Sequence, residues 1–199
     1  MQPTPVPDRG RLVAVAAVVL AVLVVLGTLL VTRQTGGEGP PSAECASAGP
    51  AVRVDPAALP AGPVAGWGPE QLANAAAIVN AGADLGLDTC AQVIGVMTAM
   101  GESSLRVLDR GDAAGPDSRG LFQQRDNGAW GSYADRMDPT TSATNFFRAL
   151  REVPGWRSLE PTIAAHRTQR NADPYHYERW WDDAVEVVSA LAGRPVLGP

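Results

Sequence analysis

The sequence predicts a mainly α-helical domain behind one N-terminal transmembrane helix, with at most a small irregular or hairpin segment that would make it α+β. Three observations support this prediction. One apolar run stands near the N-terminus, apolar residues recur at helical spacing in several later windows, and one stretch is dense in turn residues. The formal net charge is −5 and no Lys/Arg-rich block is present, so we do not expect nucleic acid as a partner.

The apolar run, residues 12–31, is long enough to cross a bilayer, because about 20 helical residues cover a hydrocarbon core of roughly 30 Å. A cleavable signal peptide is the alternative, but its apolar region usually has only about 7 to 15 residues. Arg9 and Arg11 precede the run and Arg33 follows it, which favours a cytoplasmic tail at 1–11. We therefore expect a single-pass protein of the cell membrane with its bulk outside the cytoplasm.

Residues 32–66 are rich in Pro and Gly, which predicts an extended, poorly packed linker before a domain at 67–192. Cys45 lies in this linker, and Cys90 begins a predicted helix. Outside the cytoplasm the two cysteines can persist as a disulfide, and we favour that pairing. Two alternatives stay open: a buried free thiol, and a Cys90 nucleophile in a thiol peptidase. The candidate bases for such a nucleophile are His166 and His176.

The domain is predicted to begin with two neighbouring helices. The first opens with Pro69 in its first turn, carries apolar residues at helical spacing, and stops at Gly86. The second runs from Cys90 to about Gly101 and is apolar nearly all round. A helix with that composition belongs in the core of a domain.

The remaining residues divide into a turn-rich stretch and further helices. Residues 108–137 are packed with Gly, Pro, Asp and Asn around one short apolar pair, so we predict a loop or a short hairpin. Prolines then mark the openings of three helices. We predict these helices at 138–154, 161–165 and 173–192, with a C-terminal tail at 193–199.

Glu102 is the strongest candidate for chemistry. It ends the most apolar predicted helix and precedes the turn-rich stretch. Withdrawal from water and the negative end of the helix dipole both disfavour a carboxylate, so we expect a raised pKa in the range useful to a general acid. Cleavage of a glycosidic bond requires such an acid. The alternative is a solvated glutamate just past a helix end.

The residues around Glu102 form a recognisable pattern. Glu102-Ser103 is followed after a loop by Gly120-Leu121-Phe122-Gln123 and then by Trp130-Gly131. This pattern resembles the lysozyme-like superfamily, in particular its soluble lytic transglycosylase (SLT) type and a membrane-anchored actinobacterial branch of that type. The likeness extends over about 71–181. The chain departs from the superfamily in a longer loop at 112–117 and in having Thr168-Gln169-Arg170 in place of a late Ala-Tyr-Asn motif.

The resemblance implies a lysozyme-like fold and roles for individual residues. Glu102 matches the catalytic acid/base, Gln123 matches a residue lining the glycan groove, and Ser103 matches a hydrogen-bonding position beside the acid. The resemblance therefore makes Gln123 and Ser103 candidates for substrate binding. Gln169 is a weaker candidate for substrate binding, because the motif around it is altered. Independently of the resemblance, aromatic residues can stack on sugar faces, with a core role as the alternative; the candidates are Trp130, Tyr133 and Tyr177.

The implied activity is that of a peptidoglycan lytic transglycosylase, which cuts between N-acetylmuramic acid and N-acetylglucosamine and leaves a 1,6-anhydro sugar. A muramidase-type hydrolase would need a second carboxylate. Asp109, Asp112 and Asp117 are candidates, although turn roles suit them better. A different class of function is a catalytically silent module that binds glycan strands or scaffolds a cell-wall or secretion complex. We expect peptidoglycan as the partner, with a secretion or conjugation apparatus as a further candidate, and no metal or cofactor site is indicated.

Overall fold

The structure is a computed structural model that describes residues 40–113 and 115–198. The predicted cytoplasmic tail 1–11 and transmembrane helix 12–31 lie outside the described residues, as does the start of the predicted linker. Within the described part of the chain, every helix is too short or too polar to span a bilayer.

The described residues form a mainly α-helical unit, which confirms the predicted class. Strand pairing is limited, in the described residues, to two isolated antiparallel bridges, Val64 with Trp67 and Arg119 with Gln124. Within 40–113 and 115–198, three short 3-10 helices occur, at Ala43–Cys45 (η1), Trp156–Ser158 (η2) and Glu178–Trp180 (η3). The α-helices are α2 (Pro69–Asp84), α3 (Thr89–Ser103), α4 (Tyr133–Met137), α5 (Pro139–Arg151), α6 (Pro161–Gln169) and α7 (Trp181–Ala192).

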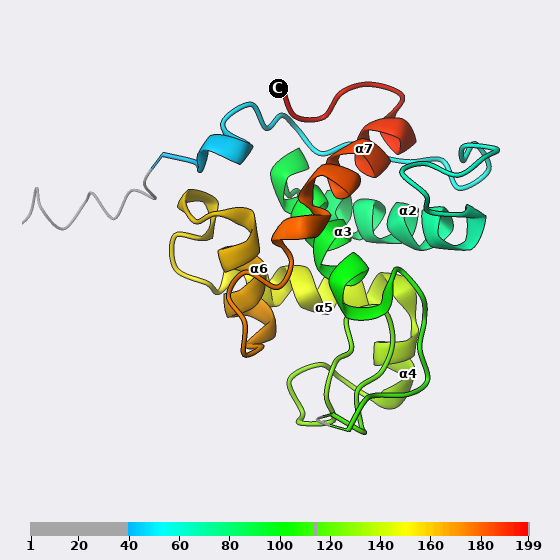
Figure 1. The fold of residues 1–199 in the computed structure, drawn as a ribbon, viewed down its shortest axis with the longest axis vertical. Helices are drawn as coiled ribbons and strands as arrows, with labels where there is room; N and C mark the ends of the chain where they lie inside the picture. Colours follow the sequence, from blue (N-terminus) through cyan, green and yellow to red (C-terminus); the bar gives the residue numbers. More distant parts are fainter. Residues whose placement is uncertain (1–39, 114, 199) are drawn as a thin grey trace, which may run out of the picture. The chain divides into compact units, whose positions relative to one another are not determined.

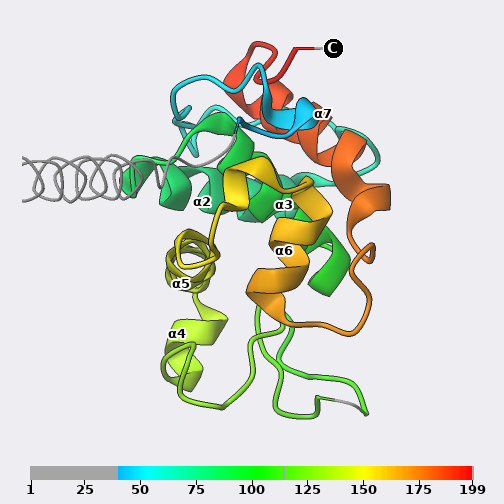
Figure 2. The same ribbon diagram turned by 90° about the vertical axis from the view of Figure 1, so that its left-hand side faces the viewer.

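Helix α3 is the central element, as its apolar composition predicts. It packs against α2, α5, α6 and α7, which surround it in Figures 1 and 2. All of its residues from Thr89 to Met100 are buried. Gly95 allows close packing, because an added Cβ would lie 2.6 Å from Cζ of Phe147 on α5. The carboxylate of Asp88 caps α3 by accepting a hydrogen bond from the Ala91 amide at 3.0 Å.

The last predicted helix begins later than expected. A helix was predicted from residue 173, but α7 starts at Trp181. The Asp173 carboxylate accepts a hydrogen bond from the Tyr175 amide at 2.9 Å, which forms a local turn instead of capping a helix. The chain then passes through η3 before α7 begins. The predicted 108–137 loop also contains the short helix α4, which the sequence pattern did not indicate.

The predicted linker at 32–66 is not a poorly packed spacer throughout its described part. Cys45, Val52 and Val54 are buried in the hydrophobic core, whereas residues 55–66 are exposed or half-buried. The Gln92 side chain accepts from the Val52 amide at 3.0 Å and donates to its carbonyl at 2.8 Å. Asn80 makes the same pair of bonds with Val54, each at 2.9 Å. These side chains satisfy the backbone as a neighbouring strand would, so a Pro-rich segment can be buried.

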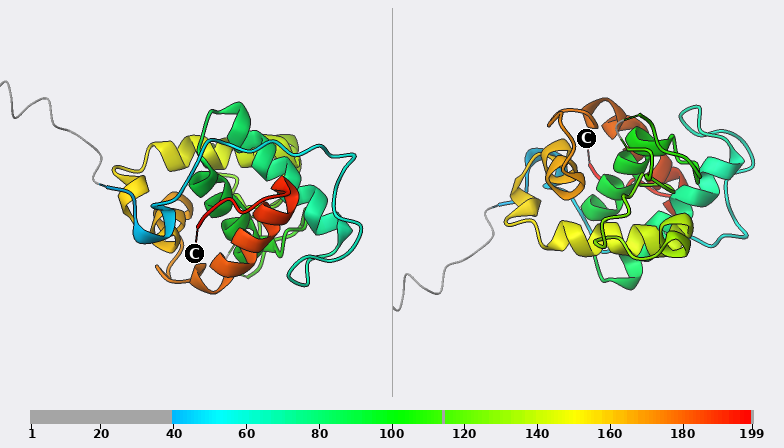
Figure 3. Two further views of the ribbon diagram at one scale, coloured as in Figure 1. Left: turned by 90° about the horizontal axis from the view of Figure 1, so that it is seen from above. Right: turned by 90° about the horizontal axis from the view of Figure 1, so that it is seen from below.

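The predicted C-terminal tail is also partly packed. Val196 and Leu197 are buried, and Thr89 donates a hydrogen bond to the Val196 carbonyl at 3.1 Å. The Gly198 amide donates to the Ser47 hydroxyl at 2.6 Å, so the C-terminal segment and the residues after η1 lie side by side (Figure 3). The packed unit therefore extends beyond 67–192 at both ends.

The predicted disulfide between Cys45 and Cys90 is confirmed. The Cα atoms of the two residues are 5.4 Å apart, and both cysteines are buried. The bond joins η1 to the first turn of α3, so it fixes the segment around residue 45 to the central helix. A Cys90 nucleophile is excluded, because its sulfur has no thiol to ionise.

Candidate active site

A groove with two compartments lies at the C-terminal end of α3. The loop that follows α3, which can be traced in Figures 1 and 2, contributes many of the lining residues. The Trp130 compartment has a volume of about 570 Å³ and is also lined by Asn127, Gln169 and Arg170. The His176 compartment has a volume of about 550 Å³ and is also lined by Arg110 and Asp173. Both compartments share Glu102, Asp112, Ser118, Gln123 and Asn171. Glu102 therefore lies where the two halves of one groove meet.

Glu102 has the raised pKa that its position predicts. It stands in the last turn of α3 and is half-buried. Burial is the largest influence on the pKa of Glu102 and raises it, with a smaller contribution from the negative charge of Asp112. Hydrogen bonds from Tyr177 and Gln169 lower this pKa in part, as does the nearby His176. The protonated acid and the carboxylate are thus both supported by neighbouring groups.

Tyr177 is the main functional residue that sequence reasoning misplaced. It was a candidate for stacking on sugars, but it is completely buried and its hydroxyl donates to Oε1 of Glu102. Burial and the neighbouring Glu102 raise the pKa of Tyr177, so the phenol stays protonated and keeps donating. Gly101 makes room for the tyrosine ring, because an added Cβ would lie 2.7 Å from Cδ1 of Tyr177. A glycine directly before the glutamate is the only local signal of this approach.

The backbone after Glu102 is held by side chains of α2. Ser104 and Leu105 both have φ of 55°, an unfavourable value for residues other than glycine, and this conformation ends α3. The Gln71 side chain donates to the Ser104 carbonyl at 2.9 Å, and Asn74 donates to the Leu105 carbonyl at 2.8 Å. These bonds fix the direction in which the last turn of α3 presents Glu102.

Ser103 does not lie in the groove, contrary to the expected binding role. Its side chain is buried, and its hydroxyl donates to the carbonyls of Ala99 at 3.2 Å and Leu121 at 2.8 Å. The second bond ties the end of α3 to the turn that carries Gln123. Ser103 therefore acts on the site through the backbone, because a buried hydroxyl is not available to a ligand.

Gln123 lines both compartments from a tight turn. An isolated bridge between Arg119 and Gln124 closes this turn, which is the only hairpin-like feature of the predicted loop in the described residues. Gln123 has φ of 44°, which costs free energy for a residue with a side chain. Gly120 in the same turn has φ of 74°, and an added Cβ would overlap the Arg136 carbonyl.

Gln169 lies beside Glu102, at the end of α6. Its amide nitrogen donates to the Phe122 carbonyl at 2.7 Å, and its side chain also forms a hydrogen bond with Glu102. The ring of Phe122 is buried and stacked on Phe146 of α5, with centroids 4.7 Å apart. Gln169 thus connects the acid to a rigid part of the core.

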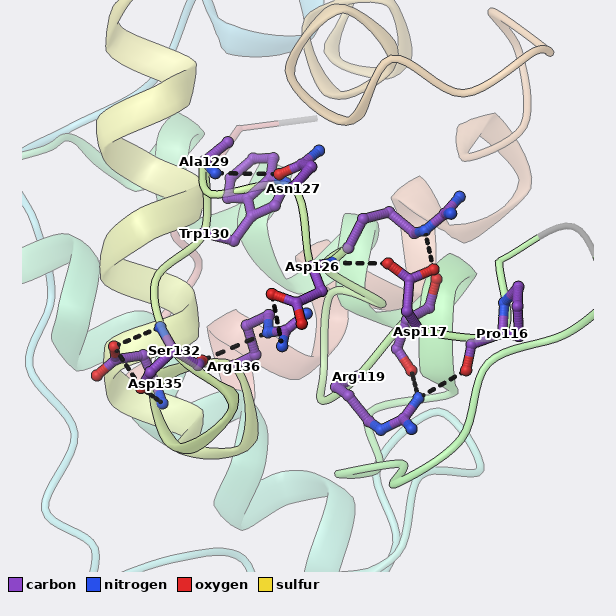
Figure 4. A network of polar contacts seen from close by, with 12 residues as sticks. Pro116, Asp117, Arg119, Asp126, Asn127, Ala129, Trp130, Ser132, Asp135 and Arg136 are labelled. Carbon is purple, nitrogen blue, oxygen red and sulfur yellow. Dashed lines mark hydrogen bonds and ion pairs between the residues drawn. The ribbon is translucent and has the colours of Figure 1, made fainter.

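A network of polar contacts holds the loop that carries Trp130 (Figure 4). The Asn145 side chain donates to the Trp130 carbonyl at 3.1 Å, and Asn127 accepts from the Ala129 amide at 3.0 Å. Below them, buried Arg136 forms an ion pair with Asp126 at 3.3 Å. The loop is therefore braced from both α4 and α5.

Tyr133 does not lie in the groove, contrary to its expected role in sugar stacking. It is 50% exposed at the start of α4 and lines neither compartment. Its hydroxyl forms a hydrogen bond with Asp109. Tyr133 is the first residue of α4, which opens with a capping box at Ser132.

The three loop aspartates have different surroundings. Asp109 forms an ion pair with Arg119 at 3.0 Å. Asp117 forms one with Arg125 at 2.5 Å and accepts from the Asp126 amide at 2.8 Å. Of the three, only Asp112 lines the groove, where it accepts from the Gly115 amide at 2.7 Å. Within the described residues, no cluster of three or more His, Cys, Asp or Glu side chains is arranged to hold a metal ion.

The two histidines belong to the surroundings of the groove. His176 lines its own compartment, and its Nε2 lies 3.4 Å from the Gly101 carbonyl. His166 pairs with Asn171 through Nδ1 at 2.6 Å. Neither histidine is available to a Cys90 nucleophile, whose sulfur is in the disulfide.

The arrangement can donate one proton from Glu102 to a ligand that extends through both compartments, and can then stabilise the resulting carboxylate through Tyr177 and Gln169. No protein-family model matches the chain, and a search of curated proteins also finds no match.

Proposed function

We propose that this chain is a membrane-anchored, lysozyme-like enzyme that cuts the glycan strands of bacterial peptidoglycan on the outer side of the cytoplasmic membrane. The observation that supports the proposal most is the position of Glu102. A carboxyl group with a raised pKa stands at the junction of two compartments, so a strand lying along the groove would have a sugar on each side of the acid.

In the first step, Glu102 would protonate the glycosidic oxygen between N-acetylmuramic acid and N-acetylglucosamine as the bond breaks. The muramic ring takes on oxocarbenium character in this step. Burial keeps the proton on Glu102 at a pH where an exposed glutamate has lost it. The hydrogen bonds from Tyr177 and Gln169 then stabilise the carboxylate that remains.

In the second step, the Glu102 carboxylate would take the proton of the muramic C6 hydroxyl while its oxygen bonds to C1. The product is a 1,6-anhydro sugar, no water is consumed, and Glu102 regains its proton. This lytic transglycosylase reaction needs one carboxyl group that serves as acid and then as base, which suits a glutamate with donors for its charged form.

A hydrolase is the second candidate, because Asp112 lines both compartments beside Glu102. In that reaction Asp112 would take a proton from a water molecule, whose oxygen bonds to C1 of the muramic residue. The product then has a reducing end. The two reactions therefore differ by one water in the mass of the product.

The expected location has separate support. The Cys45–Cys90 disulfide is typical of a compartment outside the cytoplasm, and the apolar run 12–31 is long enough to anchor the chain. Peptidoglycan lies in that space. A secretion or conjugation apparatus that must pass the wall remains a candidate partner.

The test is digestion of purified peptidoglycan by the full chain, with mass spectrometry of the released fragments. We expect fragments with anhydro ends from the parent and none from Glu102→Gln, which keeps the size of the side chain but has no acidic proton to transfer. Glu70→Gln is the matched control, because Glu70 is an exposed glutamate that pairs with Arg106 at 2.7 Å and lines neither compartment.

Each result has a clear meaning. Reducing ends in place of anhydro ends would favour the hydrolase. Fragments released equally by Glu102→Gln would refute the role of Glu102. A parent that binds strands without cutting them would refute the enzyme and favour a catalytically silent module that grips glycan or scaffolds a complex.

A further inference from the structure

We propose that Arg170 forms a carboxylate-binding subsite in the Trp130 compartment, which makes the groove select glycan strands with acidic substituents over neutral strands. This inference rests on the proposed function, because it concerns the substrate of the same groove. It adds a residue that discriminates between strands of the same backbone.

The first observation is that the charge of Arg170 is not used within the protein. Arg170 follows α6, is exposed, and lines the Trp130 compartment. Over residues 40–113 and 115–198, its guanidinium takes part in no ion pair or hydrogen bond. A guanidinium with free donors facing a groove is suited to a carboxylate, which it can bind through two parallel hydrogen bonds.

The second observation is the backbone of Arg170. It is the C-cap of α6 with φ of 57° and ψ of 36°, a left-handed conformation that usually falls to glycine. The C-cap of α7 has the same conformation and is Gly193. An arginine in this conformation costs stability relative to glycine, and such costs are concentrated at functional sites. Gln123, the other groove residue with a positive φ, fits the same pattern.

The third observation is the distribution of charge along the groove. In the Trp130 compartment the charged side chains are Arg125 and Arg170 against Glu102 and Asp112. Two cations therefore face two carboxyl groups in this compartment. In the His176 compartment, Arg110 alone faces the three carboxyl groups of Glu102, Asp112 and Asp173. An acidic substituent is therefore favoured on the Trp130 side of Glu102 over the other side.

The chemistry of the strand identifies the substituent. Every second sugar of a peptidoglycan strand carries a lactyl ether, whose carboxyl group is either free or linked to a peptide with carboxylates of its own. A strand made only of N-acetylglucosamine has the same backbone and no carboxylate. Either source of carboxylate can meet the Arg170 guanidinium, so the experiment must separate them.

The test measures binding of strands of equal length to the full chain in the Glu102→Gln background, where no strand is cut. The three ligands are strands with peptides, strands from which the peptides have been removed to leave free lactyl carboxylates, and neutral N-acetylglucosamine oligomers. Arg170→Gln is compared with Arg167→Gln, an exposed arginine one turn earlier in α6 that lines neither compartment. Arg170→Gly is a second variant that suits the left-handed backbone, so loss of binding in it does not reflect misfolding.

We expect Arg170→Gln and Arg170→Gly to raise the Kd of acidic strands by about tenfold or more, the effect of losing a charged hydrogen bond. The Kd of the neutral oligomers should change less than about twofold, and Arg167→Gln should change neither. If the variants bind peptide-free strands more weakly, Arg170 binds the lactyl carboxylate. If they bind only the peptide-bearing strands more weakly, Arg170 binds a carboxylate of the peptide. Equal weakening of acidic and neutral strands, or no weakening, would overturn the subsite. Failure of the proposed function is a different result, namely an uncut substrate with the parent chain.

Discussion

Replacing Tyr177 with phenylalanine removes the buried hydroxyl that contacts Glu102 and tests how the pKa of Glu102 is controlled. The Tyr177 hydroxyl donates to Oε1 of Glu102, and this bond lowers the pKa of Glu102 against the larger effect of burial. Without the donor the carboxylate loses a partner in a buried position. The pKa of Glu102 should therefore rise further above its ordinary value in Tyr177→Phe.

The size of the change follows from the strength of the bond. A hydrogen bond to a charged group contributes about 1.5–3 kcal/mol. Part of this free energy persists when Glu102 is protonated, because the phenol can also donate to a neutral carboxyl oxygen. About half of it therefore contributes to the free-energy difference between ionised and protonated Glu102. About 1.4 kcal/mol corresponds to one pKa unit, and we expect a rise of roughly half to one unit.

Two measurements check this rise. In the pH dependence of kcat/KM for peptidoglycan cleavage, activity is lost on the basic side as the acid ionises, so this limb should move upward by about half to one pH unit. NMR titration of the Glu102 carboxyl carbon reports the same pKa without needing activity. Tyr133→Phe is the matched control, because Tyr133 also bonds to a carboxylate, that of Asp109, outside the groove. A basic limb that stays in place or moves to lower pH in Tyr177→Phe would refute the reasoning.

Three further predictions concern stability and packing. Because the pKa of Glu102 is raised in the folded state, ionisation of Glu102 destabilises the fold as pH rises from about 4.3 through the raised value. Glu102→Gln should therefore have a higher Tm than the parent at pH 7, and this gain in Tm should shrink by pH 4. An equal gain in Tm at both pH values would contradict the prediction. Replacing Cys45 and Cys90 with serine should lower the free energy of unfolding in urea by about 2–4 kcal/mol, since the disulfide closes a loop with a separation of 45 residues. If reductant leaves the free energy of unfolding of the parent unchanged, this argues against the disulfide. Gly101→Ala should displace Tyr177 and reduce cleavage more than it reduces Tm, which circular dichroism and fragment release together would show; unchanged cleavage would mean that the ring does not need this space.

Local sequence was sufficient to predict the central helix α3 and the raised pKa of Glu102 in its last turn. An apolar run bounded by a cap and a glycine can only be satisfied in a core, so the burial of α3 followed from composition alone. A glutamate at the end of that helix is partly buried with it, so the direction of its pKa shift could be predicted without knowing its distant partners. The pairing of Cys45 with Cys90 followed from their number and the expected compartment.

Contacts between distant segments could not be predicted in this way. Tyr177 lies 75 residues from Glu102, and Gln169 lies 47 residues from Phe122, whose carbonyl it binds. Helical periodicity tells which face of a helix is buried but not which side chain of another element meets it. The tertiary structure alone therefore placed Tyr177 and Gln169 on the acid and turned Ser103 and Tyr133 away from the groove.

The same distinction explains the segments before α2 and after α7. Their Pro- and Gly-rich composition is typical of chain that forms no α-helix, and the described residues there contain only the 3-10 helix η1 and the Val64–Trp67 bridge. It does not show whether that chain is buried. The helices supply side chains that form hydrogen bonds with the backbone of these segments, so the backbone can be buried without losing its partners; these side chains are Gln92, Asn80 and Thr89. Only the folded arrangement brings these groups together.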